Sequence, residues 1–207
     1  MPNQTITVLD HGIGNIRSVI NALDFCGYKV NLVGEAGNIT SGDLVILPGV
    51  GNFGGVMNAI KSNGFYEEVK DYIFDNQPLL GICVGMQVLF QASEEAPQTP
   101  GFEFFDGHLE HISKLEPTKS TPSIGWHDLT YKNQNSVASG LTEAYFVHNY
   151  FASGVRSEEL LSTYAWHGHS IPAHVSRGKI HGVQFHPEKS RLQGLKFLSG
   201  LISEILH

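Results

Sequence analysis

The feature that most constrains the fold is the alternation of strand-like and helix-like segments in the first half of the chain. Short runs typical of strands lie at 6–9, 29–33, 44–47 and 79–83. Helical spacing is found between or after them, from 16 to near Gly27, at 54–63, at 65–75 and at 85–92. Such a β-α-β order predicts a parallel sheet with right-handed crossovers. Run 44–47 is wholly apolar, so we expect it to be buried on both faces.

The second half of the chain has a different pattern. Strand-like segments, several of alternating polarity, lie at 107–115, 128–131, 144–152, 160–166, 171–176 and 179–185. Stretches 94–101 and 116–123 are predicted loops. An amphipathic helix at 190–206 closes the chain, with its apolar positions at Leu192, Leu195, Leu198, Leu201, Ile202, Ile205 and Leu206. We therefore expect one α/β domain, 1–207, with a mixed, mainly parallel central sheet flanked by helices.

Composition excludes several classes of function. The net charge of -7 argues against a nucleic-acid binder, which would show a basic patch. No apolar run approaches the ~20 residues that span a bilayer, and the first residues lack the pattern of a signal peptide. The chain has two cysteines, Cys26 and Cys83, which is too few for a disulfide framework. A reducing, cytoplasmic setting is expected.

One cysteine lies in a sequence typical of a nucleophile. Gly81-Ile82-Cys83-Val84-Gly85 follows an apolar strand and precedes a helix, as in the G-x-S-x-G nucleophile elbow with cysteine in place of serine. A tight strand-to-helix turn strains the nucleophile and needs small neighbours. The helix N-terminus would favour the thiolate. The alternative is a buried structural cysteine, because cysteine is among the most buried residue types.

A thiol nucleophile needs a base, and His186 is the best candidate. It follows an apolar strand and precedes Glu188 by two positions, so the carboxylate could orient the imidazole. The chain has eleven histidines, and two other pairs have spacings compatible with metal ligation, His108 with His111 and His167 with His169. We interpret these as ordinary strand or loop residues, since no cysteine or carboxylate cluster in the sequence accompanies them. No metal site is predicted.

A glycine-rich segment follows the third strand. In Pro48-Gly49-Val50-Gly51-Asn52-Phe53, backbone N–H groups could face an anion. A phosphate-binding loop is one interpretation, but the G-x-x-x-x-G-K pattern is absent. An oxyanion hole is the other, and the loss of one donor from such a hole typically costs about 2.7–4 kcal/mol of barrier.

Taken in order, these segments resemble the class I (triad) glutamine amidotransferases, and most of all the glutaminase subunits of imidazole glycerol phosphate synthases. The resemblance covers nearly the whole chain. It rests on six motifs, at Asp10–Asn15, Leu47–Gly51, Leu80–Gln87, Ser93–Pro97, Tyr145–His148 and Gly182–Ser190. Their order and spacing make the match specific, whereas each alone would be weak.

The resemblance implies an enzyme that hydrolyses glutamine with a triad of Cys83, His186 and Glu188. Cys83 would attack the carboxamide, His186 would transfer protons, and Glu188 would orient the imidazolium. Backbone N–H groups of Gly51 and Val84 would stabilise the oxyanion. The resemblance further implies that glutamine is held by Gly49, Gln87, Glu95, Asn149 and Tyr150, with Gln87 and Glu95 matching positions that hold its α-carboxylate and α-ammonium. No cofactor is implied.

The same resemblance implies a partner, a separate (β/α)8-barrel cyclase that forms a heterodimer with this chain and receives ammonia through its barrel core. The positions near the interface would be Asn15, Trp126, Tyr145 and Lys189. Glutaminase subunits of this family are typically almost idle until the synthase binds its ligand. The implied switch is a peptide flip in the Pro48–Gly51 loop, which the glycines beside Val50 make sterically plausible.

One segment departs from the family pattern. The family usually carries Pro-His-Met-Gly-Trp-Asn where this chain has Pro122-Ser123-Ile124-Gly125-Trp126-His127. The triad is unaffected, but the segment lies toward the partner. The identity of the partner is therefore open, and the nearest alternative is a paralogous subunit that supplies ammonia for the amidation of bacterial surface sugars. Two further alternatives are a catalytically silent binding module, against which the intact cysteine, histidine and glutamate argue, and a stand-alone cysteine hydrolase of γ-glutamyl compounds.

Overall fold

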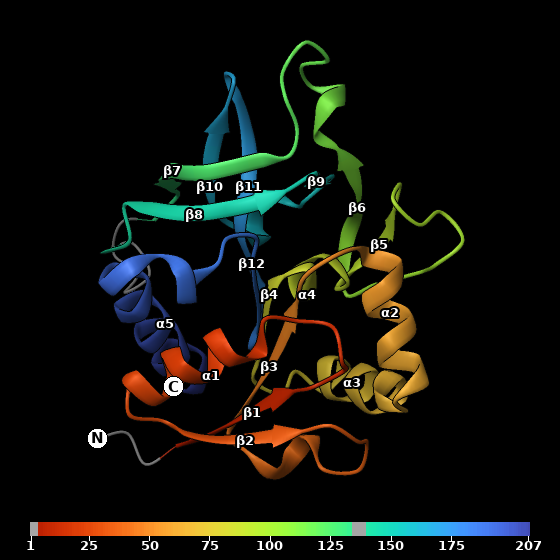
Figure 1. Cartoon of the computed structure of the whole chain (residues 1–207), viewed down its shortest axis with the longest axis vertical. Coiled ribbons are helices and arrows are strands. Elements are labelled where there is room, and N and C mark those ends of the chain that lie inside the picture. The colour runs from red at the N-terminus through yellow and green to blue at the C-terminus, as the bar shows by residue number, and fades with distance from the viewer. Residues whose placement is uncertain (1–3, 134–139) are drawn as a thin grey trace.

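The computed structural model describes residues 4–133 and 140–207 of the 207-residue chain. A nine-stranded sheet crosses the molecule in the order β2-β1-β3-β4-β12-β11-β10-β7-β8, and a three-stranded sheet, β5-β6-β9, lies beside it (Figure 1). The strands are β1 Thr5–Leu9, β2 Lys29–Val33, β3 Leu44–Gly49, β4 Leu79–Cys83, β5 Phe90–Ser93, β6 Phe105–His111, β7 Ser123–Tyr131, β8 Glu143–His148, β9 Tyr150–Ser153, β10 Leu160–Trp166, β11 His169–Arg177 and β12 Ile180–Val183. The α-helices are α1 Ile16–Phe25, α2 Phe53–Ser62, α3 Phe65–Phe74, α4 Val84–Gln87 and α5 Arg191–Leu206.

The large sheet has two halves. Strands β2, β1, β3, β4 and β12 are parallel neighbours, and we call them the parallel half. Strands β11, β10, β7 and β8 continue the sheet through antiparallel pairs and form the antiparallel half. Helices α1 and α5 lie together beside the parallel half, while α2 and α3 lie on its other side (Figure 1). The predicted mixed sheet with flanking helices is therefore present. It is not mainly parallel, because four of its strand pairs are parallel and four are antiparallel.

Burial explains the parallel half. All residues of β3 and β4 are buried, as the apolar run at 44–47 predicted. Helix α2 begins where the Asn52 side chain accepts a hydrogen bond from Gly55 N at 2.6 Å.

In the described residues, no helix is long and apolar enough to cross a membrane.

Four details of the predicted elements were wrong. The strand expected at 107–115 ends at His111, and a 3-10 helix follows at Ile112–Lys114. The helix expected at 85–92 ends at Gln87, and the chain then forms β5. The carbonyls of Val88 and Leu89 accept hydrogen bonds from Phe102 and Phe104, so tertiary pairing prevails over helical spacing in a short apolar run. The strand expected at 144–152 is divided at Asn149 into β8 and β9, which belong to different sheets. Ser123, expected in a loop, begins β7.

The closing helix is present over the predicted range, but one of its apolar positions is outside the core. Leu198, Leu201 and Ile202 are fully buried, whereas Leu192 is 52% exposed. Leu192 lies in the first turn of α5, one residue after the helix begins. Periodicity identified the buried face, but it did not show that this face starts only at the next turn.

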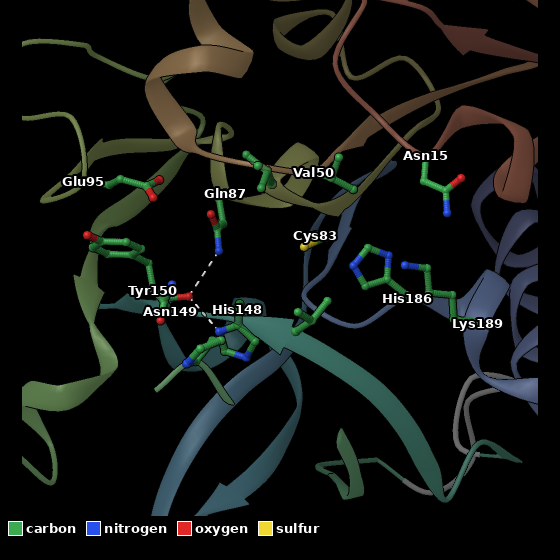
Figure 2. A pocket seen from close by; sticks show the side chains of 14 residues that line it. Asn15, Val50, Cys83, Gln87, Glu95, His148, Asn149, Tyr150, His186 and Lys189 are labelled. Atoms are coloured by element: carbon green, nitrogen blue, oxygen red, sulfur yellow. Dashed lines mark hydrogen bonds between the residues drawn. The ribbon is translucent and has the colours of Figure 1, made fainter. Parts of the chain in front are cut away.

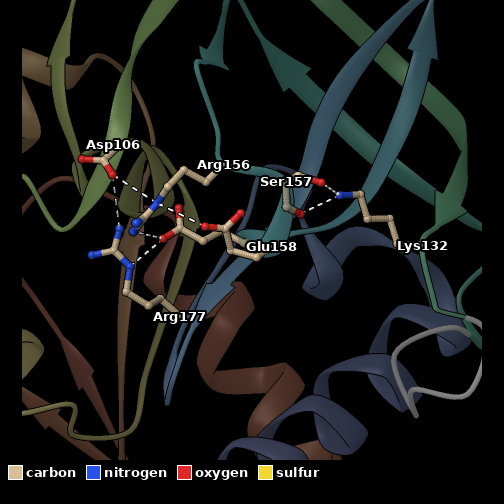
Figure 3. A network of polar contacts seen from close by, with 7 residues as sticks. Asp106, Lys132, Arg156, Ser157, Glu158 and Arg177 are labelled. Carbon is tan, nitrogen blue, oxygen red and sulfur yellow. Dashed lines mark hydrogen bonds and ion pairs between the residues drawn. The ribbon is translucent and has the colours of Figure 1, made fainter.

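An ion-pair network joins the three-stranded sheet to the antiparallel half (Figure 3). The buried carboxylate of Glu159 accepts hydrogen bonds from Arg156 and from Arg177 Nε, the latter at 2.6 Å. Both guanidinium groups also reach Asp106 of β6, at 3.1 Å and 3.9 Å. Because Arg177 ends β11, the network holds the start of β6, at Asp106, against the large sheet.

Candidate active site

Cys83 lies at the turn between β4 and α4, and its backbone has φ 55° and ψ −111°. A positive φ at a residue with a side chain is strained and persists only where the surroundings impose it. Close backbone packing surrounds this turn and glycines permit it, because a Cβ on Gly85 would lie 1.8 Å from the Leu47 carbonyl oxygen. A Cβ on Gly81 would lie 2.6 Å from the Gly85 carbonyl oxygen. The predicted elbow is thus a turn in which the backbones of β3, β4 and α4 are in close contact.

His186 and Glu188 lie just beyond β12, the strand beside β4. His186 Nδ1 and Glu188 Oε1 are 2.8 Å apart, and both side chains are 2% exposed. The His186 backbone is fixed on both sides, since its N–H donates to Tyr145 O at 3.0 Å and its carbonyl accepts from Ser190 Oγ at 2.7 Å. The carboxylate therefore orients a ring whose backbone is already immobile.

The other ring nitrogen of His186 faces the sulfur of Cys83 (Figure 2). Among the described residues, Nε2 is buried and has no hydrogen-bond partner. Burial by itself lowers the pKa of His186, but Cys83 and Glu188 outweigh it and raise this pKa to about 10. The raised pKa keeps the His186 ring protonated between Cys83 and Glu188.

A cavity of about 390 Å³ opens at this pair. Cys83 is only 3% exposed, yet its side chain forms part of the cavity wall. Ten residues predicted from the sequence to be functional line this cavity: Asn15, Gly51, Cys83, Val84, Gln87, Glu95, Asn149, Tyr150, His186 and Lys189. The chain thus brings together, in one cavity, residues that are up to 174 positions apart in the sequence, since 189 − 15 = 174.

Four predicted residues lie outside this lining. Glu188 lies behind the His186 ring, to which it is bonded. Gly49 is buried beside the elbow, where a Cβ would lie 2.6 Å from Gly85 N, so its position reflects a close backbone contact. Trp126 and Tyr145 face each other across β7 and β8, with ring centroids 5.9 Å apart. The Arg191 guanidinium lies 4.1 Å from the Trp126 ring centroid.

Polar groups at the other end of the cavity are hydrogen-bonded to the protein itself. Gln87 Nε2 donates to Tyr150 O at 3.1 Å and to Gln184 Oε1 at 3.0 Å. Glu95 Oε2 accepts from Phe53 N at the start of α2, at 2.7 Å. In Figure 2 the Gln87 nitrogen points toward Tyr150, and its oxygen points away from it.

Sequence reasoning did not select two buried residues at this site. Gln184 is fully buried, and its Nε2 lies 3.8 Å from the Cys83 sulfur. His148 lines the cavity, with Nδ1 2.9 Å from Tyr150 O and Nε2 2.8 Å from the Tyr164 hydroxyl. Burial lowers the pKa of His148 to about 4, so the ring is neutral. A polar residue between Val183 and Phe185 was the signal that could have identified Gln184.

One histidine outside the cavity has acidic neighbours that its sequence spacing did not reveal. His108, Glu94 and Glu110 bring ligand-type atoms within 4.8 Å of one another. The Lys114 ammonium forms ion pairs with both carboxylates. A cation of the protein itself therefore offsets part of the negative charge of this group.

The fold and the cysteine site define a class of protein. The family model described as glutamine amidotransferase class-I matches residues 7–199. The chain therefore belongs to the class-I glutamine amidotransferases.

Within this class, the chain is similar to subunits named HisH of imidazole glycerol phosphate synthase. It is 35% identical over 205 residues to that subunit of Moorella thermoacetica, with 98% of this chain and 96% of the relative covered. It is 36% identical to the subunit of Deinococcus radiodurans, with 97% and 94% covered. A protein of Emericella nidulans named imidazole glycerol phosphate synthase hisHF is 34% identical, and the match covers 96% of this chain but 38% of that protein.

Solved structures confirm the predicted fold class. A glutamine amidotransferase crystal structure superposes with a TM-score of 0.76 at 20% identity, covering 97% of this chain and 98% of the other. The structure of PurLQS from Thermotoga maritima gives a TM-score of 0.75 at 18% identity, with 98% and 99% covered. At these identities the likeness concerns the fold alone.

Proposed function

We propose that this chain is the glutaminase subunit of an imidazole glycerol phosphate synthase and that Cys83, His186 and Glu188 are its catalytic triad. The observation that carries the proposal is the strained Cys83 elbow facing a His186 ring that is oriented by Glu188, all at one cavity. The relatives named HisH, similar over nearly their whole length, support the choice of synthase.

The proposed reaction uses the ion pair directly. The Cys83 thiolate attacks the side-chain carbonyl carbon of glutamine, and the carbonyl electrons move to an oxyanion stabilised by the backbone N–H groups of Val84 and Gly51. His186 Nε2 donates its proton to the departing nitrogen, ammonia leaves, and a glutamyl thioester remains. Water then attacks the thioester while His186 accepts a proton, and glutamate and the thiolate are released.

The hydrogen bonds of the cavity refine how glutamine would be placed. Both protons of Gln87 Nε2 are used within the protein, so Gln87 offers the substrate only an acceptor oxygen. Such an oxygen suits the α-ammonium better than the α-carboxylate that the resemblance first suggested for this residue. Glu95 supplies a second acceptor, and we assign the α-carboxylate to the backbone around Asn149 and Tyr150.

A barrel-type cyclase partner completes the proposal. Asn15 and Lys189 lie at the cavity. Trp126, in the segment that departs from the family pattern, lies against Tyr145 and Arg191. The hisHF relative, of which this chain matches 38%, supports a functional link to a second unit. The unpaired state of Cys26 and Cys83 supports a cytoplasmic location. A flip of the Val50 peptide region remains our hypothesis for activation.

The test is glutamine hydrolysis with and without the cyclase-type partner and its nucleotide ligand. We expect Cys83→Ala to lower glutamine-dependent product formation by at least about 1,000-fold, because the nucleophile is lost. The partner should still use free ammonia. Cys26→Ala is the matched control and should retain activity. Glutamine hydrolysis by Cys83→Ala would refute the triad. Equal hydrolysis by the free subunit and by the complex would refute activation by the partner. Activation only by a sugar-amidating synthase would identify the paralogous function.

A further inference from the structure

The Gln184 side chain connects the nucleophile to the substrate end of the cavity. It is fully buried, and its two polar atoms have different neighbours. Gln184 Oε1 lies 3.0 Å from Gln87 Nε2, and Gln184 Nε2 lies 3.8 Å from Cys83 Sγ. Its backbone N–H donates to Ala173 O at 2.9 Å, which fixes the residue against β11. The proposed triad does not use this amide.

The direction of the hydrogen bonds that link Tyr150, Gln87, Gln184 and Cys83 follows from the Tyr150 carbonyl, where the series begins. A backbone carbonyl can only accept, so the Gln87 group that contacts Tyr150 O must be the NH₂ group. That same group contacts Gln184, so Gln184 must present its oxygen to it. The remaining Gln184 NH₂ group therefore faces the sulfur, and it is a donor. The orientation of the Gln184 amide is therefore fixed by the Tyr150 carbonyl, which can only accept.

A second contact strengthens this starting point. The Tyr150 carbonyl also lies 2.9 Å from His148 Nδ1, which must therefore carry the proton. The neutral ring then accepts at Nε2 from the Tyr164 hydroxyl, 2.8 Å away. The carbonyl is thus held by two donors, and Gln87 cannot turn its oxygen toward it without placing two acceptors together.

We propose that Gln184 is a positioning residue that donates a hydrogen bond to the Cys83 thiolate and orients it toward the substrate carbonyl. The inference rests on the proposed function of Cys83 as the nucleophile. A thiolate in a buried site needs donors, and the His186 imidazolium faces it from one side. Gln184 supplies a donor, and its orientation depends on Gln87, which contacts the substrate. Occupation of the glutamine site and stabilisation of the nucleophile would thereby share one set of hydrogen bonds.

The experiment measures alkylation of individual cysteines by iodoacetamide as a function of pH, followed by peptide mass spectrometry. Only the thiolate reacts, so the rate at Cys83 reports its ionised fraction. Gln184→Met keeps the length of the side chain but removes the donor. We expect alkylation of Cys83 to slow about tenfold near pH 6 and to approach the wild-type rate at high pH, where the thiol ionises without help. Gln91→Met, at an exposed position of β5, is the matched control.

Cys26 is an internal control for folding, since its thiol is part-buried and lies against Leu195 O, at 3.4 Å. Its alkylation should not change in Gln184→Met. If that variant does not fold, Gln184→Leu also removes the donor with an apolar side chain, and it should slow Cys83 alkylation near pH 6 in the same way. An unchanged pH profile at Cys83, with Cys26 also unchanged, would overturn the proposal. Because no glutamine is used, this result is independent of whether the protein shows glutaminase activity with any partner.

Discussion

The two halves of the large sheet hold their functional residues by different means. In the described residues of the parallel half, Thr7 in β1 and His181 in β12 are the buried polar side chains, and β3 and β4, which lead to the elbow, have none. Each antiparallel strand contains at least one buried polar residue: Ser123 in β7, His148 in β8, Ser162 in β10 and His174 in β11. The parallel half places the nucleophile through backbone contacts, and the antiparallel half shapes the cavity through side-chain hydrogen bonds.

This difference predicts different kinds of mutational damage. Where backbone segments touch, any added atom must displace a strand, and no side-chain rearrangement can relieve the clash. Where buried side chains bond to each other, removal of one partner leaves the other unpaired at a moderate cost. Three experiments test this contrast, one on the backbone contacts of the parallel half and two on the buried polar groups.

The largest effect is expected for Gly85→Ala, in α4 where its backbone touches β3 of the parallel half. Its Cβ would lie 1.8 Å from the Leu47 carbonyl oxygen, in strands that are fully buried. We expect a loss of about 4–5 kcal/mol in the free energy of unfolding, which is characteristic of a severe steric clash. Urea denaturation followed by circular dichroism measures it. Gly34→Ala is the control, since a Cβ there has no atom within 4 Å, and equal stability of the two variants would contradict backbone control of the elbow.

The same contrast explains how much could be predicted from the sequence. The apolar runs of β3 and β4 and the glycines around Cys83 carry their own signal, so the parallel half and the elbow were predicted with nearly correct boundaries. The break at Asn149 was missed because two strands of different sheets join there without an intervening loop. Gln184 was missed as a site residue because its contacts, Gln87 and Cys83, are distant in the sequence. His148 was missed although Tyr150 is only two residues away, because its contact with Tyr164 and its place in the cavity arise from the tertiary fold. Hydrogen bonds between distant residues leave no local periodicity.

An intermediate effect is expected from acidification, which acts on buried neutral histidines. His174 and His181 lie side by side on β11 and β12, 3.1 Å apart, and burial lowers the pKa of His174 well below normal and that of His181 to about 4. The unfolded state, with a histidine pKa near 6.5, binds more protons than the folded state between these values. Stability should therefore fall as the pH drops from about 6.5 toward 4, by about 2 kcal/mol for His181 alone at pH 5.

Denaturant titrations at pH 7.5, 6 and 5 measure this loss, to which His174 and His148 contribute in the same sense. His186 does not mask it, because its raised pKa gives a contribution that is already complete below pH 6.5 and is lost only as the pH rises through about 10. His181→Gln should make stability less dependent on pH, whereas His207→Gln at the exposed C-terminus should not. If His181→Gln showed the same pH dependence as the wild type, the buried His174 and His181 pair would not be the cause of the loss of stability.

The smallest effect is expected for Tyr164→Phe in the antiparallel half. Its buried hydroxyl lies 2.8 Å from His148 Nε2 and 3.2 Å from Ser123 Oγ, so the substitution leaves a buried acceptor unpaired without adding an atom. We expect a loss of about 1–2 kcal/mol in the free energy of unfolding. Tyr66→Phe, in a ring stacked on Phe102, is the matched control. Because His148 holds the Tyr150 carbonyl from which the Gln87 and Gln184 hydrogen bonds start, Tyr164→Phe should also raise the KM for glutamine more than it lowers kcat. A loss as large as that of Gly85→Ala would mean that the antiparallel half is as rigid as the parallel half, and the contrast between them would fail.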